Sequence, residues 1–160
     1  MTPTQASELV DLLLPRVVKW VAREEALILR DGVPLAPADL QLARLCGVAH
    51  PERVRLLKVA AMPAPEDPLL QATQVQTGFQ IGEAAGLTLG YGIVILETDW
   101  GDRAMLAHEL VHVGQYERLG GNEPFLFKYI SDFLNVGYIN SPLEREACEV
   151  SHRVLEVIGP

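Results

Sequence analysis

The sequence predicts an α+β protein with a small mixed or antiparallel sheet, one helix that carries the candidate functional residues, and additional helices around them. Apolar residues recur every three or four positions at both ends of the chain, as in amphipathic helices. Two stretches near the middle are rich in β-forming residues. With 160 residues, 49% of them hydrophobic, the chain suits one domain and is too short for two of ordinary size. We therefore expect a single domain over 1–160, with a helical N-terminal portion (1–50) and a core (53–156).

The first half of the chain is predicted to be mainly helical. Residues 4–30 carry apolar side chains at helical spacing, and Pro15 is expected to bend or split this helix. A second helix is expected over 37–45, where a nearby glycine ends it. Residues 53–60 alternate charged and aliphatic side chains, which predicts a half-buried strand. A loop or short helix is expected over 62–80, because prolines interrupt any longer element.

The second half is predicted to contain one strand followed by three helices. The stretch 87–98 (LTLGYGIVILET) is rich in β-forming residues and is expected to form a single strand with glycines inside it. Asp102 is expected to cap a helix over 103–119, which two glycines end. Further helices are expected over 124–136 and from Ser141 to about 158.

Composition and charge exclude several classes of partner. The formal net charge is −8, which argues against a nucleic-acid partner, because such binding needs a basic face. The N-terminus has no basic region ahead of its apolar stretch, and no apolar run approaches the ~18 residues of a membrane span. We therefore expect a cytoplasmic protein with no membrane partner. Cys46 and Cys148 are expected to be free thiols rather than a disulfide.

The most informative motif is HELVH, formed by His108, Glu109 and His112 within the predicted helix 103–119. Two histidines four residues apart lie about 40° apart around a helix, so their rings can converge on one metal ion with Glu109 beside them. This is the arrangement of zinc peptidases. The sequence therefore predicts a Zn²⁺ site with His108 and His112 as ligands.

A third ligand must come from elsewhere, since a catalytic zinc usually has three protein ligands and one position open to water. His152 and Glu123 are candidates, but glutamates cluster at the start of the last predicted helix. Glu144 is the first choice, because Ala147 follows one turn later and allows two helices to approach closely. Glu146 is the fallback.

Glu144 also has a purely structural interpretation. Ser141 and Glu144 fit the S-x-x-E capping box, in which the glutamate turns back to the first amide of its own helix. From these local residues alone, cap and ligand are equally well supported. The incomplete pair of histidines favours the ligand.

The chain resembles a known family in three segments. The order of a strand with glycines (LTLGYGIVILET), a helix with HELVHVGQYERLGG and a later helix that begins in NSPLEREACEV resembles the small bacterial gluzincin-type metallopeptidases. It is similar above all to short HExxH domains whose helix reads HELxHVxQ and whose later segment reads NPLEREA. The resemblance covers about residues 53–156 and is most specific over 104–120 and 140–147.

The resemblance implies a zincin-like fold, in which the strand before the active helix borders the cleft and pairs with an extended protein or peptide substrate. Carried over residue by residue, it makes His108, His112 and Glu144 the zinc ligands, Glu109 the general base, and Tyr91, Gly92 and Ile93 the substrate-binding edge. Cys148 departs from the pattern, because gluzincins often carry an acidic residue there that supports a zinc-bound histidine.

These residues predict zinc-dependent hydrolysis of peptide bonds, with Glu109 taking a proton from the attacking water and passing it to the leaving amine. Tyr138, His152 and Tyr116 are the available donors to the developing oxyanion. A second interpretation is a catalytically inactive zincin-like domain that binds zinc or a protein partner. A third treats HELVH as an accidental pattern in a structural helix.

Overall fold

The computed structural model describes residues 1–159, which form six α-helices and a four-stranded sheet. The helices, in chain order, are α1 (Pro3–Asp31), α2 (Pro37–Leu45), α3 (Pro68–Thr77), α4 (Arg103–Leu119), α5 (Asn122–Val136) and α6 (Pro142–Ile158). The strands are β1 (Val33–Pro34), β2 (Arg55–Val59), β3 (Gly86–Leu89) and β4 (Gly92–Leu96). The predicted α+β class is confirmed, and five of the six helices lie within two residues of the expected bounds.

The sheet is mixed, with the strand order β1-β2-β4-β3. β2 and β4 run parallel, whereas β1 and β3 each pair antiparallel with their neighbour. β4 is therefore a central strand, and β3 is an edge strand that packs on α4.

The single strand expected over 87–98 is instead a hairpin of β3 and β4. The chain reverses at Gly90, whose φ of +67° favours glycine. Glu25 of α1 fills the space beside this turn, where its Oε1 accepts a hydrogen bond from the backbone N–H of Tyr91 at 2.9 Å. Both glycines of the stretch allow the hairpin to pack closely on α1. A Cβ at Gly90 would meet the Glu25 carboxylate, and a Cβ at Gly92 would lie 2.9 Å from the Ile28 side chain.

Helix α1 runs without interruption through Pro15, so the expected split does not occur. A capping box between Thr2 and Gln5 starts the helix. Packing against α5 and the hairpin holds it on its buried side, so the one backbone hydrogen bond that proline removes does not break it. Within the described residues, no helix combines the length and apolar character needed to cross a membrane.

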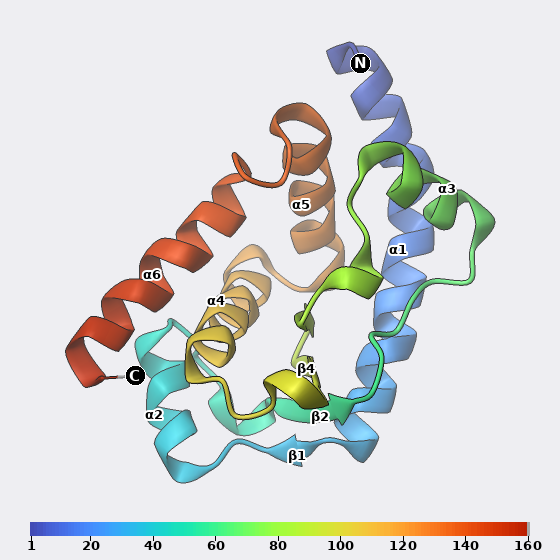
Figure 1. The fold of residues 1–160 in the computed structure, drawn as a ribbon. Helices are drawn as coiled ribbons and strands as arrows, with labels where there is room; N and C mark the ends of the chain where they lie inside the picture. The colour runs from blue at the N-terminus through green and yellow to red at the C-terminus, as the bar shows by residue number, and fades with distance from the viewer. Residues whose placement is uncertain (160) are drawn as a thin grey trace.

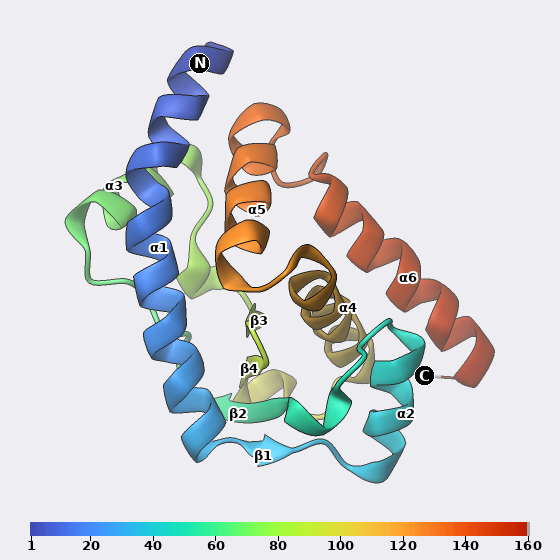
Figure 2. The same cartoon turned by 180° about the vertical axis from the view of Figure 1, so that it is seen from behind.

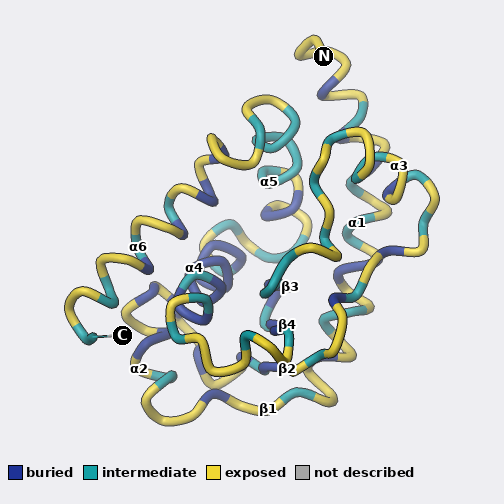
Figure 3. Tube along the Cα trace, viewed as in Figure 1, coloured by how far each residue is buried: buried dark blue, intermediate teal, exposed yellow. Residues whose placement is uncertain are grey.

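Helices α1 and α6 lie on opposite sides of the molecule, with α4, α5 and the sheet between them (Figures 1 and 2). Helix α4 is buried along most of its length (Figure 3). Ile93 and Val94 of β4 point to opposite faces of the sheet and join two apolar clusters, one toward α2, α4 and α6 and one toward α1 and α5. The candidate site is therefore built on a helix that packing fixes on all sides.

Cys46 and Cys148 are both free thiols. Cys46 is buried at the end of α2, and burial raises its pKa to about 11. Cys148 is exposed on α6. The expectation of two unpaired cysteines is confirmed.

Candidate metal centre

Helix α4 places the two histidines of HELVH side by side. Asp102 caps its start by accepting a hydrogen bond from Met105 N–H at 3.0 Å, and Gly120, at φ +102°, ends it. The helix bounds agree with the predicted 103–119. The Nε2 atoms of His108 and His112 lie 3.2 Å apart, with the rings at 79°. Both rings present Nε2 to one point, as the four-residue spacing predicts.

Glu144 reaches this point from the first turn of α6. Its Oε2 lies 3.2 Å from His108 Nε2, and its Oε1 lies 3.4 Å from His112 Nε2. Ser141 stands at the N-cap of α6, but its side chain makes no capping hydrogen bond. Because Glu144 points to the histidines and not to its own helix start, the capping-box alternative is not realised.

The three side chains form a group that could hold a metal ion, with ligand atoms all within 4.8 Å of one another. Glu144 is 5% exposed, and its buried Oε2 accepts no hydrogen bond from the described residues, although His108 is near. A buried carboxylate oxygen without a donor is costly unless a cation satisfies it. Two imidazoles and one carboxylate are also a donor set of catalytic zinc sites. The residues could therefore hold a divalent metal ion.

Electrostatics in this group favour a negative Glu144 and a protonated His112 when no metal is bound. Burial alone would raise the pKa of Glu144, but His108, His112 and Tyr129 outweigh it and hold that pKa far below its usual range. Burial acts to lower the pKa of His112, yet Glu144 and Glu109 raise it overall. A divalent cation would replace the proton on His112 as the partner of the carboxylates.

Gln115 links His112 to α6. Its Oε1 lies 2.8 Å from His112 Nδ1, and its Nε2 donates to the Leu143 carbonyl at 2.9 Å and to Glu146 Oε2 at 2.8 Å. Both amide protons are thus in use, so Oε1 is the acceptor and His112 carries its proton on Nδ1. When the ring is neutral, as it must be to bind a metal, this tautomer leaves a lone pair on Nε2, on the side of Glu144. Gln115 is fully buried, and the bond to Leu143 fixes the residue next to Glu144.

Cys148 contacts the other histidine. Its Sγ lies 3.8 Å from His108 Nδ1, the nitrogen that faces away from Glu144. The thiol of Cys148, at the position where the resemblance implies an acidic residue, is therefore adjacent to His108. A sulfur is a weaker acceptor, so His108 is less firmly oriented than His112.

Glu109 lies between the histidines and the edge strand β3. Its Oε2 accepts a hydrogen bond from Thr88 Oγ1 at 2.6 Å, and its Oε1 faces Gly86, where an added Cβ would lie 3.2 Å away. One carboxylate oxygen is thus fixed by the strand, and the other is left for a further partner.

The expected oxyanion donors have different surroundings. Tyr116 is buried and donates to the Thr88 carbonyl at 3.4 Å, and His152 is exposed on α6. Tyr138 lines the same cavity as the histidines. Tyr129, which the sequence analysis did not single out, donates to Glu144 Oε1 at 2.6 Å.

The structure corrects the expected substrate edge. Gly92 and Ile93 lie in β4, which pairs with β2 on one side and β3 on the other. Tyr91 contacts Arg53 and donates to Glu117 at 2.8 Å, away from the cavity at the histidines. The backbone of this segment is in use, so it cannot pair with another chain. The edge strand next to the histidines is β3.

The other ligand candidates lie outside the metal group. Glu146 pairs with Arg118 at 2.7 Å and accepts from Gln115. Glu123 is exposed at the start of α5. His50 is also exposed.

Comparison of the chain with protein-family models, curated proteins and solved structures finds no match.

Proposed function

We propose that this protein is a zincin-like, zinc-dependent peptidase in which His108, His112 and Glu144 hold the metal and Glu109 is the general base. The observation that supports it most is the convergence of two Nε2 atoms on a buried carboxylate whose Oε2 has no donor among the described residues. Glu109 stands beside them without joining the metal group. A ligand cannot also shuttle protons, so this division of roles is the one hydrolysis needs.

Zinc held there would polarise a substrate carbonyl and acidify a water molecule. Glu109 Oε1 would take a proton from the attacking water, while the Thr88 hydroxyl holds Oε2 and fixes the carboxylate plane. The same Oε1 later gives the proton to the leaving amine. Tyr138, on the cavity wall, is the candidate donor to the developing oxyanion.

The edge strand β3 is the candidate docking site for an extended peptide. Its ladder with β4 uses the backbone groups of Ala85, Leu87 and Leu89, as the 2.9 Å bond from Leu96 N–H to the Ala85 carbonyl indicates. The N–H groups of Gly86 and Thr88 therefore point away from β4, and a substrate strand on that side could pair with them. Gly86 is next to Glu109, so such a strand would pass the general base.

A zinc-binding domain without activity is the second candidate. Of the three expected oxyanion donors, Tyr116 is already bonded to Thr88 and His152 does not line the cavity, which leaves Tyr138 alone among them. Hydrolysis and simple binding differ in their need for Glu109.

The test compares zinc-loaded wild type, Glu109→Gln and Glu156→Gln on a broad peptide library read by mass spectrometry. Glu156 is exposed on α6 and serves as the matched control. We expect cleavage by the wild type and the control, and a loss of about 10²–10⁴-fold in Glu109→Gln with its zinc content retained. Equal cleavage by Glu109→Gln would exclude the general base, and no cleavage by any form would favour the binding domain.

A further inference from the structure

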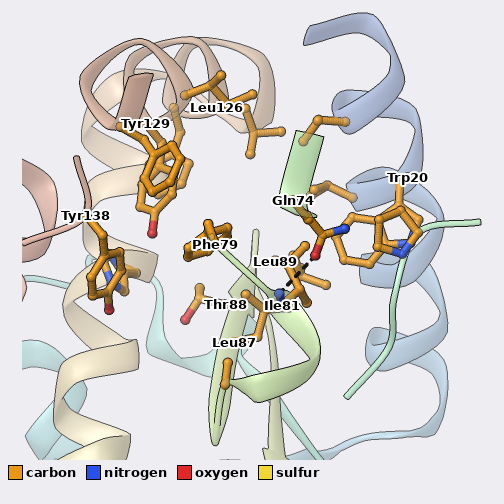
Figure 4. A pocket seen from close by; sticks show the side chains of 18 of the residues that line it. Trp20, Gln74, Phe79, Ile81, Leu87, Thr88, Leu89, Leu126, Tyr129 and Tyr138 are labelled. Atoms are coloured by element: carbon orange, nitrogen blue, oxygen red, sulfur yellow. Dashed lines mark hydrogen bonds between the residues drawn. The ribbon is translucent and has the colours of Figure 1, made fainter. Parts of the chain in front are cut away.

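An apolar cavity of about 200 Å³ begins at His108, Glu109 and His112 and extends between α1, α3, β3 and α5. We call it the apolar cavity. Figure 4 shows Leu126 and Tyr129 of α5 on one side, Trp20 of α1 opposite, and the β3 side chains below. Much of its wall thus comes from segments outside the HELVH and LEREA motifs. The proposed metal chemistry gives this space no role.

The deeper wall of the apolar cavity offers few free polar groups. Thr73 and Thr77 donate to carbonyls of their own helix at 2.9 and 2.7 Å, and Gln74 Oε1 accepts from Ile81 N–H at 3.0 Å (Figure 4). Thr88 is bonded to Glu109. Trp20 Nε1 is a buried donor without a partner among the described residues. A polar ligand would therefore find little compensation for its lost hydration.

Charge at the apolar cavity is confined to the metal end. Among the described residues that line it, Glu109 and Glu144 are the acidic ones, and no lysine, arginine or aspartate takes part. No lysine or arginine lines the cavity that could pair with an acidic side chain of a ligand. A basic side chain of a ligand would exchange water for a wall of leucine, isoleucine and aromatic groups. Both are disfavoured as occupants of the deep end.

Size narrows the class of occupant. An engineered apolar cavity of about 150 Å³ stays dry and binds benzene. A space of about 200 Å³ is somewhat larger than that and smaller than the ~300–1,000 Å³ of pockets for drug-sized ligands. It suits one large apolar side chain.

We propose that the apolar cavity receives a large uncharged side chain of the substrate, such as that of phenylalanine, leucine or methionine, and so sets the specificity of cleavage. This inference rests on the proposed function, because the cavity adjoins Glu109 and the edge of β3. Leu87 and Leu89 line the cavity, as do Gly86 and Thr88, whose N–H groups point away from β4. A peptide that pairs with β3 presents alternate side chains to one face, and the cavity takes one of them.

The first experiment measures occupancy without catalysis. Metal-free protein is melted with and without benzene, in the wild type, in Ile130→Trp, which fills the cavity, and in Phe127→Trp, an exposed residue of the same helix. With benzene at about ten times its dissociation constant, we expect Tm to rise by about 3–6 °C in the wild type and the control but not in Ile130→Trp. Leu134→Trp, another lining position, replaces Ile130→Trp if that variant does not fold. No shift in the wild type, or an equal shift in the filled variant, would overturn the proposal.

The second experiment measures specificity in the peptide library. We expect cleaved peptides to carry phenylalanine, leucine or methionine at one position next to the scissile bond, at least tenfold over aspartate or lysine, and this preference to disappear in Ile130→Trp only. Cleavage without an apolar preference would overturn the cavity proposal while the peptidase stands. Benzene binding without any cleavage would reject the peptidase and, with it, the cavity's role in cleavage, leaving only an apolar binding site.

Discussion

Both faces of α4 are largely buried, but they make different kinds of contact. One face carries His108, His112 and Gln115. These polar side chains form hydrogen bonds with one another or with α6. The opposite face carries Leu110, Gly114 and Glu117, which fix the helix to the sheet and to the segment after α2. The comparison shows that burial alone does not identify a functional residue. The site face is distinguished by polar atoms that converge near Glu144 Oε2, a buried oxygen that accepts no hydrogen bond from the described residues.

Among the three changes considered next, the largest effect on metal binding is expected at Gln115. Replacing it with leucine removes the acceptor for His112 Nδ1–H and leaves the Leu143 carbonyl without its donor. We expect the affinity for zinc to fall about 10–100-fold, as for other groups that orient a metal ligand. A chelator competition titration measures this, with exposed Gln76→Leu of α3 as the control. Unchanged affinity in Gln115→Leu would show that Gln115 does not orient His112 for the metal.

The opposite face should respond in stability and not in metal binding. A Cβ at Gly114 would lie 2.9 Å from the carbonyl oxygen of Gly47, a backbone atom that has little room to move. We expect Gly114→Ala to lower the free energy of unfolding by about 1–3 kcal/mol, despite the better helix propensity of alanine. Urea denaturation measures it. Gly82→Ala, where a Cβ meets nothing within 4 Å, is the control. A Gly114→Ala protein as stable as the wild type would contradict the close approach.

The smallest expected effect is a pH dependence of the metal-free protein. The raised pKa of His112 means that the folded protein holds more protons than the unfolded chain above pH ~6.5. Its contribution to stability is present below that pH and is lost as the pH rises through the raised pKa. The lowered pKa of Glu144 adds stability above its ordinary pKa, and this is lost only in strong acid.

Thermal melts between pH 6 and 9 check this balance. We expect Tm of the metal-free protein to fall with rising pH across this range, and the stabilisation by added zinc to grow, because zinc needs neutral histidine. A metal-free Tm that rises with pH would show that His112 and Glu144 do not face each other.

Sequence reasoning succeeded where the signal is local. The bounds of α4 follow from Asp102 and the glycines after Leu119, and the convergence of His108 and His112 follows from helical spacing alone. The contact between Gln115 and His112 could also have been predicted, since Gln115 lies three residues after His112 on the same face.

It failed where tertiary contacts decide. The stretch 87–98 reads as one strand because its β-forming residues continue across Gly90, and only the carboxylate of Glu25 beside the turn shows why the chain reverses there. The expected substrate edge at Tyr91 to Ile93 failed with it. Tyr129 reaches Glu144 from α5, and no sequence pattern connects the two. The local sequence around Glu144 supported a helix cap and a metal ligand equally, and only the position of α6 against α4 distinguishes the two.

The most direct test of the account is zinc stoichiometry in the purified protein, wild type against Glu144→Ala. Mass spectrometry of the native protein after dialysis against zinc counts the bound ions, and circular dichroism confirms that both forms fold. We expect one zinc per chain in the wild type and none retained in Glu144→Ala, with a matched Glu146→Ala protein still holding its ion. A wild type that takes up no zinc, or a Glu144→Ala protein that binds it as tightly, would contradict the three-residue metal centre.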